Sequence, residues 1–229
     1  MVTQGDLFTC AHISDLHFST VQWGLAQFFS KRWVGNANVL FARQKAFNPA
    51  SLHTLFPLFA KKKVDTVLIT GDLSSTSHPK EFMQARAFVQ QLRQEGLRVF
   101  VIPGNHDHYT KAAYTARLFY DFFPDRYEQA CPESLAVEGV TSVPIAPGWR
   151  LCLLDTALAT PLTSSRGLFS ETIEQALEST LQRIPPGERV FLINHFPLFS
   201  CDSPRKELLR REALQALLGR YPCVTLFAH

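Results

Sequence analysis

Residues 98–107 read RVFVIPGNHD, and they indicate the architecture of the whole chain. The apolar run Val99–Ile102 is followed by the turn-forming pair Pro103-Gly104 and then by three polar side chains, Asn105-His106-Asp107. A short apolar run that stops at turn residues is typical of a strand buried on both faces, so a strand is predicted at Arg98–Ile102. Such strands belong to sheets covered by helices, so the stretch predicts an α/β fold that presents polar groups where a strand ends.

The same succession of apolar run, turn and helical pattern recurs along the chain. Further strands are predicted at Leu7–Ile13, Val64–Thr70, about Arg150–Leu154, Arg189–Ile193 and Cys223–Phe227. Helices are predicted between strands, with termini marked by Ser77 and Gly96, by Ser170, and by Ser203-Pro204 and Gly219. Strands that alternate with helices indicate a layered α/β fold, whose ligand site lies beyond the carboxyl ends of the strands.

The composition is that of a globular protein. The chain has 229 residues, of which 46% are hydrophobic and 19% are charged. This balance excludes an intrinsically disordered chain and is enough for one sizeable core, so we expect a single domain over residues 1–229. The formal net charge is only +3. So small a surplus does not imply bulk binding of nucleic acid, which is not expected as a partner.

The cysteines and the N-terminus indicate an intracellular setting. The number of cysteines is odd, no pair is spaced C-x-x-C, and Cys10, Cys152 and Cys223 lie in apolar runs. We interpret them as small core residues in a reducing compartment. The first ten residues lack the regions of a signal peptide, and no run of about 18 apolar residues predicts a membrane span. A cytoplasmic protein is therefore expected.

Metal-binding side chains follow the predicted strands. Six of them lie within a few residues of a strand's carboxyl end: Asp15, His17, Asp72, Asn105, His106 and His195. Taken singly, an Asp after a strand is usually a turn or cap residue, and a His is usually packed in a loop. Several sites in order at strand ends instead favour a common function. Hard carboxylates with imidazoles are the ligands of two cations about 3.5–4 Å apart.

The residue types also suggest how two ions are shared. Asp72 is the natural bridge, because a carboxylate has two oxygens. Asp15 and His17 are two apart on an extended segment and point the same way, so both can reach one ion. Asn105 offers a neutral amide oxygen, and His195 completes the second ion.

Four motifs occur in this order: Asp15-Leu16-His17, Gly71-Asp72, Gly104-Asn105-His106-Asp107 and Asn194-His195. Together they resemble the motifs of the calcineurin-like metallophosphoesterases, and the resemblance covers nearly the whole chain. It implies a four-layer α/β fold, in which a sandwich of mixed β-sheets is flanked by helices. It also implies a hydrolase that cleaves a phosphoester or pyrophosphate bond with a water activated by two metals.

The resemblance assigns a role to each matched residue. It implies that the first ion is bound by Asp15, His17 and Asp72. The second ion is then bound by Asp72, Asn105 and His195. His106 is similar to the catalytic histidine that contacts the phosphate and protonates the leaving oxygen, and Asp107 is expected to orient His106. Manganese is the expected metal, although oxygen and nitrogen ligands without a thiolate also suit iron, zinc, cobalt or magnesium.

The C-terminus departs from the family pattern, which ends in Gly-His-x-His. This chain ends in Leu226-Phe227-Ala228-His229. His229 is either the first of those histidines or the residue before a missing motif. We therefore expect a metallophosphoesterase domain that is truncated at its C-terminus.

Residues 18–63 form an aromatic and basic insertion between the first two motifs. The segment contains Trp23, Trp33, many phenylalanines and the run Lys61-Lys62-Lys63, but no Asp or Glu. Three interpretations stay open: a helix pair packed on the core, a contact with an anionic membrane surface, and a contact with nucleotide or nucleic acid. The membrane interpretation places the protein peripherally on the inner membrane.

The substrate follows from the same segment only as a hypothesis. Some bacterial members of the family cleave the pyrophosphate of UDP-2,3-diacylglucosamine in lipid A synthesis, and the composition of residues 18–63 suits that lipid-linked nucleotide. One alternative is a phosphodiesterase that acts on cyclic nucleotides or nucleic acid. Another is a scaffold that has kept the fold and lost the chemistry.

Overall fold

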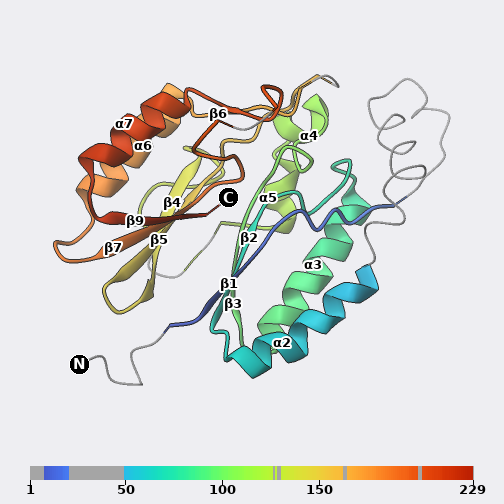
Figure 1. Cartoon of the computed structure of the whole chain (residues 1–229). Helices are drawn as coiled ribbons and strands as arrows, with labels where there is room; N and C mark the ends of the chain where they lie inside the picture. Colours follow the sequence, from blue (N-terminus) through green and yellow to red (C-terminus); the bar gives the residue numbers. More distant parts are fainter. Residues whose placement is uncertain are drawn as a thin grey trace. The chain divides into compact units, whose positions relative to one another are not determined.

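The computed structural model describes residues 8–20, 49–125, 127, 130–161, 164–200 and 203–228. The chain forms two compact units, an N-terminal unit (Met1–Phe123) and a C-terminal unit (Pro124–His229), and each is described by itself (Figure 1). The single domain over residues 1–229 stays a prediction. Of the 18–63 insertion, residues 21–48 lie outside the described residues.

The N-terminal unit is built on a parallel sheet of three strands. These are β1 (Cys10–Ile13), β2 (Thr66–Thr70) and β3 (Arg98–Ile102), in the order β1-β2-β3. All five residues of the central strand β2 are buried, which explains its continuous apolar run. Because the strands are parallel, their carboxyl ends meet at one edge of the sheet. The motif residues predicted to bind metal follow at that edge.

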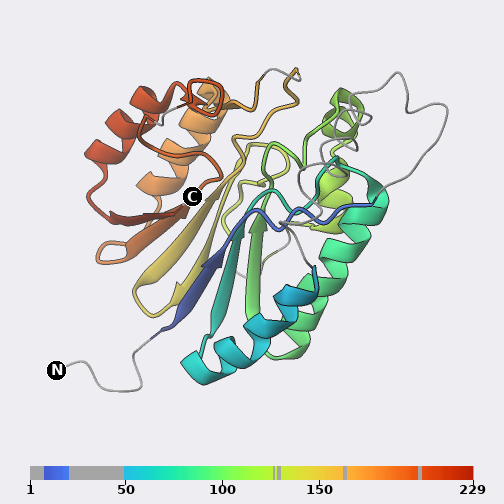
Figure 2. The same ribbon diagram turned by 45° about the vertical axis from the view of Figure 1, so that its right-hand side comes forward.

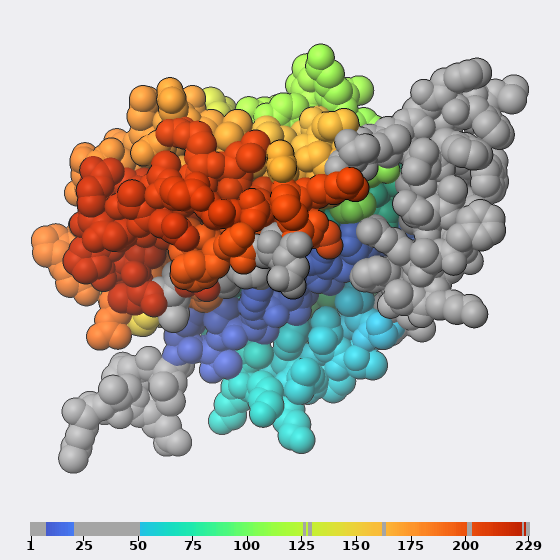
Figure 3. Space-filling view, turned by 45° about the horizontal axis from the view of Figure 1, so that its top comes forward, coloured from blue at the N-terminus to red at the C-terminus, as the bar shows by residue number. Residues whose placement is uncertain are grey.

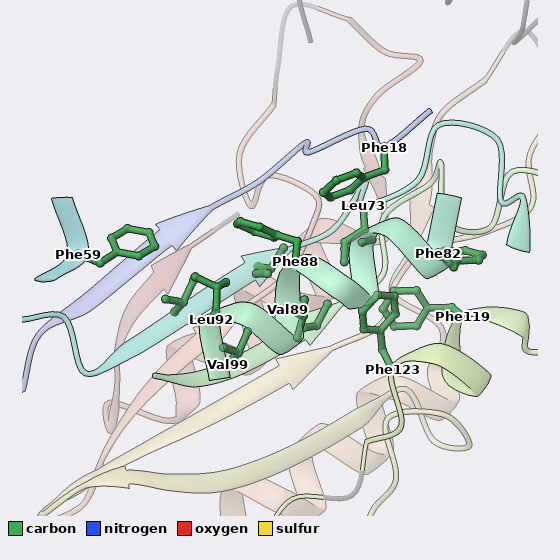
Figure 4. Close-up of a cluster of buried hydrophobic side chains, with 14 residues drawn as sticks. Phe18, Phe59, Leu73, Phe82, Phe88, Val89, Leu92, Val99, Phe119 and Phe123 are labelled. Carbon is green, nitrogen blue, oxygen red and sulfur yellow. The ribbon is translucent and has the colours of Figure 1, made fainter. Parts of the chain in front are cut away.

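One face of this sheet is covered by α2 (Leu55–Lys62) and α3 (Pro79–Gln94), with the 3-10 helix η3 (Pro49–Thr54) preceding α2 (Figure 2). Figure 4 shows the core between them, where Phe88 and Leu92 of α3 lie near Phe59 of α2 and Val99 of β3. Burying each such side chain contributes about 1.5–3 kcal/mol.

Two short helices complete the N-terminal unit, α4 (Lys111–Thr115) and α5 (Leu118–Phe122). The Phe119 ring of α5 meets Phe82 of α3 edge-on, with ring centroids 6.1 Å apart, so α5 shares the same core.

The start of α3 differs from the prediction. His78, rather than Ser77, is the N-cap residue, and it forms a capping box with Glu81. Ser77 cannot serve because its φ is 54° and its hydroxyl donates to the His106 carbonyl instead, at 2.9 Å. Pro79 occupies the first turn, where its missing N–H costs nothing.

The C-terminal unit is built on a mixed sheet of four strands. These are β4 (Val140–Ala146), β5 (Trp149–Leu154), β7 (Arg189–Ile193) and β9 (Val224–Ala228), in the order β4-β5-β7-β9. The edge strand β4 is antiparallel and the other pairs are parallel. Together with the parallel sheet of the N-terminal unit, this confirms the predicted mixed α/β class, with sheets flanked by helices.

Helices α6 (Glu171–Gln182) and α7 (Arg211–Arg220) lie together on one side of this sheet (Figure 2). Ser170 caps α6, as predicted, by accepting the Ile173 N–H. Cys152 is a buried member of the core, and burial raises the pKa of its thiol, so the interpretation of this cysteine as a core residue is confirmed.

The predicted start of the last helix at Ser203-Pro204 is wrong. The chain first forms β8 (Leu208–Leu209), which pairs with β6 (Gly167–Leu168), and α7 begins only at Arg211.

Within the described part of the chain, no helix is both long and apolar enough to cross a bilayer.

Candidate metal centre

The first two motifs lie side by side because their segments continue to pair beyond the strands. The Asp15 N–H donates to the Gly71 carbonyl at 3.1 Å. The His17 N–H donates to the Asp72 carbonyl at 2.8 Å. A parallel bridge between Phe18 and residue 74 extends this ladder. Backbone pairing therefore brings the side chains of both motifs together at the carboxyl edge.

Three side chains converge there. Ligand atoms of His17, Asp72 and His106 all lie within 4.8 Å of one another. The His17 Nε2 atom lies 3.7 Å from Asp72 Oδ2 and 3.5 Å from Asp15 Oδ1. His17 and Asp72 are buried, whereas the Asp15 side chain is 56% exposed. Carboxylates and imidazoles at this spacing fit a divalent cation of the Mn, Fe, Zn or Co type.

The carboxylate of Asp72 is held in a defined orientation. Its Oδ1 atom accepts the backbone N–H of His106 at 2.8 Å. Its Oδ2 atom faces His17. The third motif is thus tied to the second through Asp72, and the two carboxylate oxygens have different neighbours. The bridging role of Asp72 stays a prediction.

Three of the predicted ligands adopt an unfavourable backbone conformation. Asp15, His17 and Asp72 have φ values of 58°, 45° and 54°. Such left-handed conformations cost residues other than glycine about 1–3 kcal/mol each, and they persist only where surrounding interactions hold them. The backbone hydrogen bonds between the two motifs, described above, hold these residues in the left-handed conformation. Strain of this kind concentrates at functional sites.

Asp107 is placed differently from the prediction that it orients His106. Its carboxylate is fully buried and accepts four hydrogen bonds at 2.8–3.1 Å, from the Leu73 and Gly104 N–H groups and from the N–H and hydroxyl of Ser74. Asp107 therefore does not make the predicted contact with the His106 imidazole. Its carboxylate instead joins the backbone of the second motif to that of the third. Burial, with a smaller contribution from the Asp72 charge, raises the pKa of Asp107 to about 6.

The His106 imidazole is instead oriented by a backbone carbonyl. Its Nδ1 atom lies 2.7 Å from the Ser75 carbonyl oxygen. A carbonyl only accepts, so Nδ1 carries a proton that it donates to Ser75. The role of Ser75 could not be predicted from the sequence, because any residue type can supply a carbonyl and no side-chain pattern marks it.

Asn105 and His195 are placed in separate units. Asn105 is half-buried and lies in the turn closed by the Asp107 N–H and the Gly104 carbonyl at 3.1 Å. His195 follows β7 in the C-terminal unit, and its role as a ligand stays a prediction. His229 lies outside the described residues.

The peptide around His195 is fixed on both sides. Asn194 donates from Nδ2 to the Phe196 carbonyl at 2.9 Å and accepts the Thr156 hydroxyl at 2.6 Å. The Phe196 ring is buried against Gly167 of β6. A polar anchor and an apolar anchor thus flank His195 within its own unit.

This packing gives a testable prediction for Gly167→Ala. The new methyl would lie on the Phe196 ring, closer than carbon atoms approach, so the ring or the loop that carries it must shift. We expect a loss of about 1–3 kcal/mol of unfolding free energy. Urea unfolding measures this loss.

The matched control is Gly219→Ala in α7, where an added Cβ meets nothing within 4 Å. This variant should gain about 0.5–1 kcal/mol, because alanine suits a helix better than glycine. Equal stability of the two variants would contradict the proposed packing of Phe196.

The described part of the 18–63 insertion favours core packing. Phe18 and Phe59 are buried, and Phe56 packs against the same core. The exposed run Lys61–Lys63 leads directly into the amino end of β2, opposite the edge that carries the candidate site. Figure 3 shows the exposed side of α2 in cyan. These lysines therefore lie at the edge of the sheet opposite the candidate centre.

Comparisons with known proteins agree with the motifs. The family model for calcineurin-like phosphoesterases matches residues 8–229. Residues of this chain are 30% identical over 104 positions to the uncharacterized metallophosphoesterase YhaO of Bacillus subtilis, a match over 44% of this chain and 23% of that protein. They are 32% identical over 97 positions to the glycerophosphodiester phosphodiesterase GpdQ of Enterobacter lignolyticus, over 42% of this chain and 28% of that protein.

The matched stretches thus span about a quarter of each relative's length. The match to the family model, in contrast, covers residues of both units, and all four motifs lie within the matched residues. The chain belongs to the calcineurin-like phosphoesterase family.

Proposed function

We propose that this chain hydrolyses phosphodiesters with divalent metal ions bound at the candidate centre. The observation that carries the proposal is the convergence of His17, Asp72 and His106 within 4.8 Å at the carboxyl edge of a parallel sheet. Membership of the calcineurin-like phosphoesterase family supports it. Bound divalent cations supply an acidified water and neutralise charge on the phosphate oxygens.

The residues divide into ligands and a proton donor. Asp15, His17 and Asp72 would hold one ion, and Asp72, Asn105 and His195 are the ligands proposed for the other, with manganese as the proposed metal. His106 is not needed as a ligand in this scheme, although its position would allow it. Its Nδ1–H is engaged by Ser75, so a protonated imidazole presents Nε2–H as the donor to the leaving oxygen.

A phosphodiester is the proposed substrate class because one relative is named as a glycerophosphodiester phosphodiesterase. The narrower hypothesis, UDP-2,3-diacylglucosamine at an anionic membrane surface, finds no support among the described residues of the insertion. Its described aromatic residues pack in the core, and its lysine run lies at the opposite edge. The simpler diester, suggested by the named activity of one relative, is therefore the substrate that we propose.

The substrate assay separates these alternatives. With Mn²⁺ present, we expect turnover of glycerophosphodiesters and of bis(4-nitrophenyl) phosphate, and little turnover of UDP-2,3-diacylglucosamine. A preference for the lipid would restore the narrower hypothesis. Inactivity toward all three substrates in the metal-loaded protein would overturn the proposed function.

His106→Asn tests the assigned proton donor. Nitrophenolate leaves without a proton, whereas an alkoxide requires one. We expect the variant to lose about a hundredfold or more in kcat on an alkyl diester, the usual size of a general-acid contribution. The loss on the nitrophenyl ester should be much smaller. Metal content should stay unchanged, and loss of metal would show that His106 is a ligand.

A further inference from the structure

We propose that Tyr109 is a positioning residue that holds the His106 imidazole in the orientation needed for proton donation. The proposal rests on the proposed function, in which His106 is the donor. The two rings are stacked, with centroids 5.5 Å apart and planes inclined by only 13°. Tyr109 belongs to none of the metal motifs.

The imidazole is held from three directions. Its Nδ1 atom is tied to the Ser75 carbonyl at 2.7 Å. The His17 ring meets it edge-on, with centroids 4.8 Å apart and planes at 89°. The Tyr109 ring is stacked parallel to it. The χ2 torsion of histidine has a broad energy minimum, so one hydrogen bond to Nδ1 still allows the plane of the ring to swing by moderate angles. A parallel ring packed against its face limits that swing.

The position of Tyr109 is itself determined by the fold. Its N–H donates to the Ser77 hydroxyl at 2.6 Å, and that hydroxyl donates to the His106 carbonyl at 2.9 Å. Ser77 thereby joins the backbones of the two stacked residues and fixes their separation. The Tyr109 side chain is only 9% exposed, so the stack is part of the packed structure rather than a surface contact.

Orientation of the donor matters only when the leaving oxygen needs a proton. A displaced imidazole slows the loss of an alkoxide, which must be protonated as its bond to phosphorus breaks. It has little influence on nitrophenolate, which departs as an anion. A merely structural role for Tyr109 would lower both rates alike. The dependence on the leaving group therefore distinguishes positioning from general stabilisation.

The experiment compares Tyr109→Leu, Tyr109→Phe and His106→Asn on a glycerophosphodiester and on bis(4-nitrophenyl) phosphate. We expect Tyr109→Leu to lower kcat on the alkyl diester about tenfold, part of the full contribution of a general acid, with KM nearly unchanged. The nitrophenyl rate should change less than twofold. Tyr109→Phe restores the ring and should recover most of the alkyl rate. In the His106→Asn background, Tyr109→Leu should add no further loss.

Tyr114→Leu is the matched control. The Tyr114 ring packs edge-on against the His108 ring, with ring centroids 5.1 Å apart, and neither residue belongs to the candidate centre. It should cost stability without any dependence on the leaving group. If Tyr109→Leu does not fold, Tyr109→Met, whose unbranched side chain adapts to an irregular cavity, is measured in the same way. Equal losses on both substrates, or no loss on either, would overturn the role of Tyr109. If His106→Asn itself shows no leaving-group dependence, the assigned proton donor fails instead.

Discussion

Asp72→Ala is expected to reduce hydrolysis of every phosphoester to the level of the buffer blank. Asp72 is the one predicted ligand shared by both ions, and its Oδ1 atom also anchors the third motif through the His106 N–H. The substitution therefore removes a charge from the centre and a tether from the loop that carries the proton donor. Bound manganese after gel filtration should fall with activity.

Two further variants identify the cause of that loss. Asp72→Asn keeps an oxygen for the His106 N–H but removes the charge, so it should retain folding and lose metal. Asp121→Ala removes an exposed carboxylate from α5 and changes the net charge equally. It should behave as the parent protein. Unchanged turnover in Asp72→Ala would contradict a metal centre at this position.

Asp107→Ala should produce the largest loss of stability. Three backbone N–H groups and one hydroxyl, in a fully buried setting, would lose a charged acceptor. At about 1–3 kcal/mol for each buried donor left unsatisfied, a total of about 4 kcal/mol or more is expected. That is a large share of the roughly 5–15 kcal/mol that stabilises a typical domain.

Amide hydrogen exchange is the decisive readout for Asp107→Ala, because it reports each segment separately. Exchange should accelerate at residues 73, 74 and 104, where the donors lie. Asp121→Ala again serves as the control and should leave exchange there unchanged. If Asp107→Ala lost activity while these amides stayed protected, its carboxylate would act in the chemistry rather than in the joining of two motifs.

The pattern of apolar residues was sufficient to predict the bounds of two strands that are largely buried. The predicted strands Arg98–Ile102 and Arg189–Ile193 have the observed bounds. Strand β4 was not predicted, because Pro144 interrupts its pattern. The structure accommodates Pro144 on an edge strand, beside an irregularity in the pairing register, where a ladder hydrogen bond is not required.

The site was predictable as far as it depends on side-chain type. Asp and His residues at strand ends indicated which side chains meet, and the structure brings His17, Asp72 and His106 together. Contacts made through the backbone leave no such pattern. The Ser75 carbonyl that orients His106, and the N–H groups that capture Asp107, depend on how two loops approach each other. The role expected for Asp107 was wrong for this reason.

The left-handed backbone of Asp15, His17 and Asp72 has a consequence for any attempt to improve this protein. Glycine adopts that conformation freely, and the Asp15 side chain is 56% exposed, so a selection for thermal resistance alone would favour glycine at position 15. Such a variant would be more stable and would lack a predicted metal ligand. Directed evolution of this chain must therefore screen for turnover in every round, because heat tolerance and catalysis favour different residues at this position.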